Sequence, residues 1–212
     1  MQKIKSIKGG VCSAKGFRAA GVAAEIKYKG RNDVALVVAD APAAAAAVFT
    51  TNKVAAAPVV YDRAIVRGGV IQAILANSGC ANACTGEGGL KDARLSALVT
   101  AGELGIDPKH VLVASTGVIG RRLPMDRLLS GVKKAVKALG RTSAHALNAE
   151  KAIMTTDTRP KEAAVSVVIG GKKVVVGGMC KGSGMIEPNM ATMLGFITTD
   201  AAVTPAMLRR AL

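Results

Sequence analysis

Aromatic side chains are scarce in this sequence, which has no tryptophan and an aromatic content of only 2%. Half of its 212 residues are nevertheless apolar, which is enough for a real core, and these are mainly small side chains. A core of small side chains lets helices and strands approach closely. We therefore expect a mixed α/β (α+β) fold, in which sheets and helices pack as layers of a single unit.

Acidic residues are also few, 14 against 29 lysines and arginines, so the formal net charge is +15. Such a charge suits a nucleic-acid partner when the cations gather on one face. The densest group, Lys133, Lys134 and Lys137, instead alternates with Val132 and Val136 at helical spacing, as on a solvated helix face. Without a known reader motif or stacking aromatics, we expect no nucleic-acid partner. A non-catalytic basic protein that binds polyanions remains an alternative function.

Long hydrophobic runs are missing too. Residues 68–86 carry no charge, but Gln72, Asn77 and Thr85 make this stretch too polar to cross a bilayer. No apolar segment follows the basic N-terminus, so no secretory signal is indicated, and we expect a cytoplasmic protein without a membrane partner. The cysteines offer one C-x-x-x-C spacing and no second pair, so we expect them to be reduced and structural. They are Cys12, Cys80, Cys84 and Cys180.

Common catalytic motifs are absent. Residues 177–184 (GGMCKGSG) lack the residue order of a phosphate-binding P-loop, and no GxGxxG or GxSxG signature occurs. His110 and His145 are the only histidines, so a Ser-His-Asp triad is not indicated and both are expected at the surface or at a helix cap. We therefore expect no bound metal and no organic cofactor.

Two hairpins are predicted. Residues 21–29 and 34–40 flank a turn and predict the first, with 43–52 as a further strand. Residues 163–169 and 172–178 predict the second, because the Gly-Gly pair between them supplies the positive φ that a tight turn requires.

Helices and buried strands are predicted between these hairpins. Buried strands are expected at 70–79 and 110–117, and a helix at 90–105 with one face formed by Leu95, Leu98, Val99 and Gly102. A second helix follows Pro124 and ends at Gly140, and Ser143 is expected to cap a third that runs toward Met154.

The remaining chemistry is that of a hydroxyl group without histidine. A threonine becomes an effective nucleophile when its own α-amine, freed by chain cleavage, acts as the base. That amine titrates at about 7.7–8.0, so part of it is unprotonated near neutral pH. Cleavage needs a small preceding residue and a strained turn. Ala191-Thr192 meets the first need, and Pro188 with Gly182 and Gly184 suits the second. From spacing alone, a methionine-lined strand entering the core is the favoured interpretation.

A series of segments resembles the ornithine acetyltransferase family, the glutamate N-acetyltransferases of arginine biosynthesis. Residues 181–201 (KGSGMIEPNMATMLGFITTDA) are similar to the family's autoprocessing segment, and five others occur in the family's order. These are GGVCSAKGFRAAGVAAEIK (9–27), PAAAAAVFTTNKVAAAPV (42–59), ANSGCANACTGEGG (76–89), STGVIGRRLPM (115–125) and AIMTTDTRPKEAA (152–164). The resemblance implies an ornithine acetyltransferase/DmpA-like fold of mixed sheets and helices.

The resemblance also implies a mechanism. The precursor would be cut between Ala191 and Thr192, which leaves Thr192 as the N-terminal nucleophile. Thr192 would take acetyl from N2-acetylornithine and pass it to glutamate, giving ornithine and N-acetylglutamate. The match to the family's oxyanion pair is Thr116 and Gly117. Thr155 and Lys181 match positions that contact substrate, where a lysine suits an α-carboxylate. An alternative for Thr155 is a helix-end hydroxyl bonded to its own backbone.

The implied organisation divides the chain. Residues 1–191 would form the first (alpha) subunit and 192–212 the start of the second (beta) subunit, which is truncated relative to the family. Two alpha and two beta chains would form a heterotetramer, and some relatives also accept acetyl-CoA as donor.

We expect little turnover from the 212-residue chain alone. Asn77 and Asn82 are assigned a structural turn role, and Cys80 departs from an expected asparagine. A related N-terminal-nucleophile aminopeptidase or amidohydrolase is the alternative enzyme.

Overall fold

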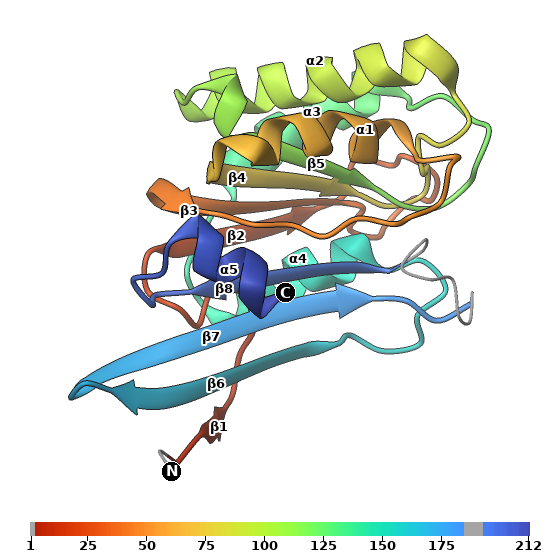
Figure 1. Ribbon diagram of the computed structural model, residues 1–212. Coiled ribbons are helices and arrows are strands. Elements are labelled where there is room, and N and C mark those ends of the chain that lie inside the picture. The colour runs from red at the N-terminus through yellow and green to blue at the C-terminus, as the bar shows by residue number, and fades with distance from the viewer. Residues whose placement is uncertain (1–2, 185–192) are drawn as a thin grey trace.

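The computed structural model describes residues 3–184 and 193–212, which form two four-stranded sheets with helices around and between them (Figure 1). The strand orders are β2-β3-β4-β5 and β1-β6-β7-β8, and β4 and β5 run parallel while the other neighbours run antiparallel. The first sheet comprises β2 (Phe17–Val22), β3 (Val34–Ala44), β4 (Val70–Asn77) and β5 (Val111–Ser115). The second comprises β1 (Lys5–Ile7), β6 (Glu162–Ile169), β7 (Lys172–Lys181) and β8 (Leu194–Thr199).

The helices complete a layered arrangement. Three helices cover the outer face of the β2–β5 sheet, and α4 lies between the two sheets (Figure 1). The helices are α1 (Ala57–Ile65), α2 (Gly86–Leu104), α3 (Met125–Lys137), α4 (Ser143–Ile153) and α5 (Pro205–Ala211), with 3-10 turns at Val66–Gly68 and Pro108–His110. This arrangement confirms the expected mixed α/β fold.

Small side chains let α4 pack closely against both sheets. Ala146, Ala149 and Ala152 of α4 are buried in one cluster with Ala19 of β2 and Met179 of β7. The contact is closest at Gly21 of β2, where an added Cβ would lie 1.9 Å from the carbonyl oxygen of Asn148. The alanine-rich composition therefore permits a helix to pack tightly between two sheets.

The helix predicted at 90–105 is confirmed as part of α2, but of its predicted apolar face only Val99 packs against the core. Leu95 and Leu98 are 41% and 56% exposed. The face that packs inward carries small or polar residues: Gly89, Asp92, Ala93, Ser96, Ala97, Thr100 and Ala101. The hydroxyls of Ser96 and Thr100 donate to the backbone carbonyls four residues earlier, each at 2.7 Å, so they can be buried without loss of hydrogen bonding.

The second predicted hairpin is confirmed as β6 and β7, with Gly170 and Gly171 at φ 56° and 75°. The first is real but misplaced, because β2 covers 17–22 instead of 21–29. The Asp33 carboxylate accepts the N–H groups of Ala24 (2.7 Å) and Ile26 (2.6 Å), which holds the chain after Val22 as an irregular loop.

Of the other predicted strands and helices, some are confirmed and some are not. The strands at 70–79 and 110–117 and the helix after Pro124 are confirmed as β4, β5 and α3, with Lys133, Lys134 and Lys137 exposed. The strand predicted at 43–52 is wrong beyond Ala44, where β3 ends. Thr142, one residue before Ser143, is the N-cap of α4.

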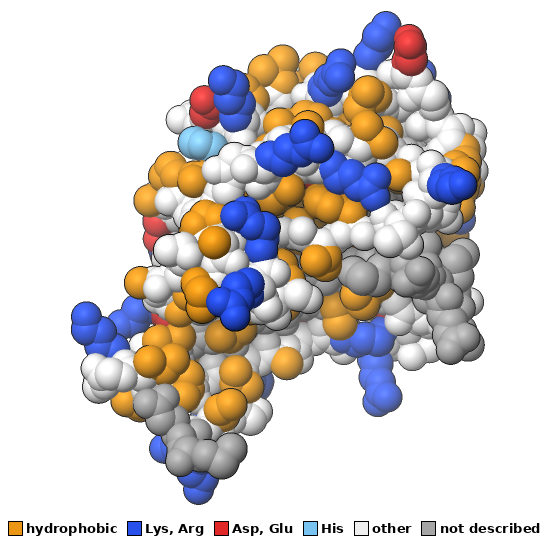
Figure 2. Space-filling model, viewed as in Figure 1, with side chains coloured by type: hydrophobic (Ala, Val, Ile, Leu, Met, Phe, Trp, Pro, Cys, Tyr) orange, Lys and Arg blue, Asp and Glu red, His pale blue; other side chains and the backbone are white. Residues whose placement is uncertain are grey.

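Positive side chains are spread over the visible face with apolar residues between them (Figure 2). Within residues 3–184 and 193–212, no helix combines the length and the hydropathy needed to cross a membrane.

Two glycine substitutions test the close packing of α4. Gly21→Ala should lower the free energy of unfolding by at least about 2 kcal/mol, because its Cβ would overlap the Asn148 carbonyl. Gly102→Ala on α2 meets no atom within 4 Å and should raise stability by about 0.5–1 kcal/mol. Urea unfolding measures the free energy of unfolding of both variants. Equal changes in the two variants would contradict the close packing of α4 against β2.

Candidate active site

Three residues singled out in the sequence meet at one point. The ammonium of Lys181, at the end of β7, donates to Thr116 Oγ1 at 3.1 Å and to Thr155 Oγ1 at 2.8 Å. Thr116 follows β5 of the other sheet, and Thr155 follows α4 in the middle layer. Lys181 thus joins the two sheets and the α4 layer between them through hydrogen bonds.

The Lys181 ammonium lies in an unusual environment for a lysine. The residue is only 4% exposed, so it is not a solvated turn lysine. Burial lowers the pKa of Lys181 from its ordinary 10.5, an effect that the Asp157 carboxylate opposes. Its partners in the described part of the chain are two neutral hydroxyls. An ammonium has three donors, so the third can bind an anionic ligand.

Thr155 does not behave as a helix-end hydroxyl bonded to its own backbone. Its Oγ1 accepts from Lys181, while its backbone N–H donates to the Asp157 carboxylate at 3.2 Å. The alternative considered for Thr155 from sequence is therefore wrong in this structure.

Gly117 occupies a backbone position that no other residue would fill easily. Its φ is 134°, and an added Cβ would lie 2.4 Å from the carbonyl carbon of Gly79. The Thr116 N–H donates to the Asn77 carbonyl at 3.0 Å, so Thr116 can offer a ligand its hydroxyl. The chain near Gly117 is fixed further by Val118, whose N–H donates to the Gly79 carbonyl at 3.3 Å.

The asparagines in the neighbouring turn have the structural role predicted for them. The Asn77 amide donates to the Cys80 carbonyl at 2.9 Å and accepts from Ser115 Oγ at 2.7 Å. Asn82 has a φ of 48° and donates to the Gly89 carbonyl at 2.9 Å. These bonds fix the turn beside Thr116.

Asp157 is a residue of this site that sequence reasoning missed. Its side chain is 1% exposed and accepts from the Lys161 ammonium, the Gly182 N–H (2.9 Å) and the Thr155 N–H. Burial alone would raise the pKa of Asp157, but these hydrogen bonds hold it at about 2. The available signal was the aspartate inside the TTDTRPK segment. Asp157 fixes both the Thr155 loop and the chain that leaves β7.

The predicted cleavage pair, Ala191 and Thr192, lies outside the described residues. The chain on either side is described, and Lys181 of β7 pairs with Leu194 of β8 across the second sheet. Residues 182–193 therefore connect two adjacent strands whose ends meet at Lys181.

Among the described residues, no histidine ring or thiol is hydrogen-bonded to the side chains of this cluster, although Cys80 forms a β-bridge with Thr116 and Cys180 directly precedes Lys181. The His145 ring is within 2.6 Å of the Thr142 hydroxyl at the start of α4, as expected of a residue near a helix cap. All four cysteines are free thiols, and Cys80 donates to the Arg121 carbonyl at 3.1 Å. Among the residues that the structure describes, no group of three or more His, Cys, Asp or Glu side chains could hold a metal ion.

The fold is shared with the L-aminopeptidase D-Ala-esterase/amidase of Ochrobactrum anthropi, whose structure is described as a variant of the Ntn hydrolase fold. At 12% identity and a TM-score of 0.56 over 99% of this chain and 68% of that one, this likeness shows the fold alone. The ArgJ family model matches residues 18–212, and the chain belongs to this family.

Solved and curated relatives agree with this assignment. An ArgJ structure from Bacillus halodurans has a TM-score of 0.85 at 41% identity, covering 92% of this chain and 100% of that chain. The ornithine acetyltransferase of Mycobacterium tuberculosis, solved with ornithine, has a TM-score of 0.83 at 42% identity. The match covers 91% of this chain and 100% of that chain. The ArgJ protein of Symbiobacterium thermophilum is 55% identical over 208 residues, which are 97% of this chain but 51% of that protein. The chain thus spans about half the length of the curated relatives it matches.

Asp157→Asn should destabilise the protein in a pH-dependent way. The folded pKa of about 2 lies below the ordinary 3.8, so the carboxylate contributes stability above pH 4 that is lost as the pH falls toward 2. The variant should be less stable by about 2 kcal/mol at pH 7, with a difference that shrinks at acid pH. Chemical unfolding from pH 7 to pH 2.5 checks this, and a constant difference would contradict it.

Proposed function

We propose that this chain forms the first part of an amino-acid N-acetyltransferase precursor. The enzyme transfers acetyl from N2-acetylornithine to glutamate and releases ornithine. Residues 1–191 would be the first subunit, and 192–212 would begin the second. The observation that carries the proposal is the Lys181–Thr116–Thr155 cluster beside the β7–β8 connection, in a chain of the ArgJ family.

Covalent geometry supports Thr192 as the nucleophile. Thr192 is two residues before Leu194, which pairs with Lys181, and two residues span at most about 7 Å. Met193, the described residue that directly follows Thr192 in the sequence, is next to the strand position that pairs with Lys181. An added Cβ on Gly182 would lie 3.9 Å from Met193 Cα, so both ends of the connection are close together.

The lengths of the relatives also support cleavage. This chain covers about half of the curated ArgJ sequences, yet it covers 100% of each of two solved chains. Those solved chains are therefore no longer than this one, as expected if a longer precursor is cut into two pieces.

We propose a role for each residue in the transfer. The Thr192 oxygen would attack the acetyl carbonyl while its α-amine takes the hydroxyl proton, and that proton passes to the departing ornithine nitrogen. The product is an acetyl ester on Thr192, which the glutamate amine then attacks. The Thr116 hydroxyl and the Gly117 N–H would stabilise the oxyanion in each step. Lys181 would pair with the substrate α-carboxylate, and Thr155 would orient Lys181.

The proposed assembly of subunits follows from membership of the ArgJ family. The second subunit would come from the same precursor, and two copies of each subunit would form a cytoplasmic heterotetramer. The residues of the cluster perform the chemistry through hydroxyl, amine and ammonium groups, so the proposal includes no metal and no bound cofactor. Acetyl-CoA can act as an alternative acetyl donor in this scheme, since a thioester presents the same acetyl carbonyl.

Cleavage is tested on protein expressed from the complete reading frame. Intact-mass analysis should find two polypeptides that meet at Ala191/Thr192, and Thr192→Ala should give one uncut chain without acetyl transfer. Thr192→Ser keeps a hydroxyl and serves as the control that should still be cut. A single uncut wild-type chain that transfers acetyl would refute the mechanism.

Thr116→Val tests the oxyanion role without a change in volume. Loss of the hydroxyl should lower kcat about 10²-fold, because a donor to the developing negative charge is removed. Thr100→Val is a matched control, since Thr100 is also buried but its hydroxyl donates to the Ser96 carbonyl within α2. Steady-state kinetics of both variants decide the point, and equal kcat values would exclude a catalytic role for Thr116.

A further inference from the structure

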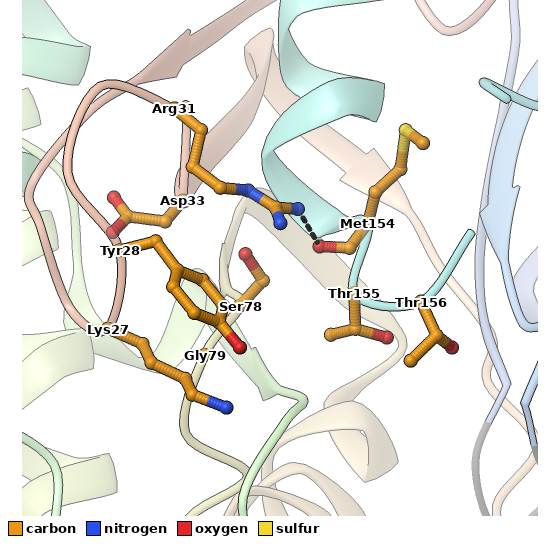
Figure 3. Close-up of a pocket in the computed structure, with 9 residues that line it drawn as sticks. All are labelled: Lys27, Tyr28, Arg31, Asp33, Ser78, Gly79, Met154, Thr155 and Thr156. Carbon is orange, nitrogen blue, oxygen red and sulfur yellow. Dashed lines mark hydrogen bonds between the residues drawn. The ribbon is translucent and has the colours of Figure 1, made fainter. Parts of the chain in front are cut away.

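A pocket of about 90 Å³, open to solvent, adjoins the Thr155 side of the cluster (Figure 3). The loop between β2 and β3 forms one wall and the chain that follows α4 forms the opposite wall. The lining residues that matter are Lys27, Tyr28, Arg31, Gly79, Thr155 and Thr156.

Two cations at this pocket lack a carboxylate partner. The Lys27 ammonium lies 4.7 Å from the centre of the Tyr28 ring. The Cζ atom of the Arg31 guanidinium lies 5.6 Å from the same ring centre. Arg31 uses one nitrogen to donate to the Met154 carbonyl at 2.8 Å (Figure 3). Neither cation forms an ion pair with a residue in the described ranges 3–184 and 193–212.

The carboxylate that lines the pocket is already occupied. Asp33 is 3% exposed, and its two oxygens accept the backbone N–H groups of Ala24 and Ile26. Asp33 therefore supports the loop and, within the described residues, forms no ion pair with Lys27 or Arg31, although the charge of Arg31 opposes the rise in the pKa of Asp33 that burial causes. The pocket thus has cationic side chains on the wall formed by the β2–β3 loop and threonine side chains on the opposite wall (Figure 3).

The pocket is joined to the catalytic cluster through backbone contacts. Arg31 holds the carbonyl of Met154, the residue directly before Thr155. At the base of the pocket, an added Cβ on Gly79 would lie 2.9 Å from Lys27 Cβ, and one on Gly117 would lie 2.4 Å from the Gly79 carbonyl carbon. The loop that carries Lys27 thus lies directly against the turn that positions Gly117.

We propose that this pocket binds the side-chain carboxylate of the acidic acyl acceptor, with Lys27 and Arg31 as its cationic partners. The inference rests on the proposed acetyl transfer and adds the basis of acceptor choice. Lys181 would hold the α-carboxylate that donor and acceptor share. The pocket would attract the second carboxylate of glutamate and repel the side-chain ammonium of ornithine, so the two amino acids are distinguished by opposite charges.

The test separates the two half-reactions of protein expressed from the complete reading frame. Exchange of labelled ornithine into N2-acetylornithine, without glutamate, reports the donor half, and formation of N-acetylglutamate reports the acceptor half. Lys27→Gln should raise the KM for glutamate about tenfold, because a charge-assisted contact is lost. The exchange rate should not fall, because loss of the Lys27 charge reduces the repulsion of the ornithine ammonium. Lys27→Arg, which keeps the charge, should retain most of the affinity for glutamate.

Lys29→Gln is the matched control, because Lys29 is exposed on the same loop but does not line the pocket. It removes the same charge and should leave the KM for glutamate unchanged. Glutamine as acceptor adds a second readout, since Lys27→Gln should reduce the preference for glutamate over glutamine by about the same tenfold factor.

Four results would overturn the inference. One is an equal effect of Lys27→Gln and Lys29→Gln on the KM for glutamate, and another is an unchanged preference for glutamate over glutamine. A third is a loss of exchange as large as the loss of transfer. The fourth is an effect confined to acetyl-CoA as donor, which would assign the cations to phosphate groups. Wild-type protein without ornithine exchange would instead refute the proposed function, and this result is distinct from the other four.

Discussion

The buried ammonium of Lys181 is the contact on which this site depends. It joins a threonine at the end of one sheet to a threonine after the central helix, and it does so from a strand of the other sheet. Such a short three-way contact requires the layers to pack closely. The alanines of α4 and the glycine at position 21 allow this, so the small-residue composition and the site geometry have one physical cause.

The Asp157 carboxylate offsets the positive charge of Lys181 without forming an ion pair with it in the part of the chain that the structure describes. Asp157 raises the pKa of Lys181, which burial alone would lower further, but its oxygens accept hydrogen bonds from Lys161, Gly182 and Thr155. Within the described residues, Asp157 therefore forms no ion pair with the Lys181 ammonium. Asp157 also fixes the chain on both sides of the cluster, because its carboxylate accepts the backbone N–H groups of Gly182, which follows β7, and of Thr155. A single carboxylate thus supports both the electrostatics and the position of the site.

The sequence predicted elements whose signals are local and missed features that depend on tertiary packing. The Gly170-Gly171 turn and the strands β4 and β5 were predictable because turn chemistry and apolar runs determine them. The buried face of α2 was not, since its serine and threonine hydroxyls bond within the helix and replace the expected leucines. The start of the first hairpin was also misplaced, because Asp33 holds the following loop. Thr116, Thr155 and Lys181 were predicted from family resemblance, and spacing alone would not have brought them together.

Locating the acetyl group during turnover tests the central claim most directly. Protein from the complete reading frame is mixed with N2-acetylornithine, quenched in acid and digested, and the modified peptide is identified by mass spectrometry. The account predicts an acetyl ester on the hydroxyl of Thr192, at the N-terminus created by cleavage. Acetyl on the Lys181 amine, or transfer with no covalent intermediate, would contradict it.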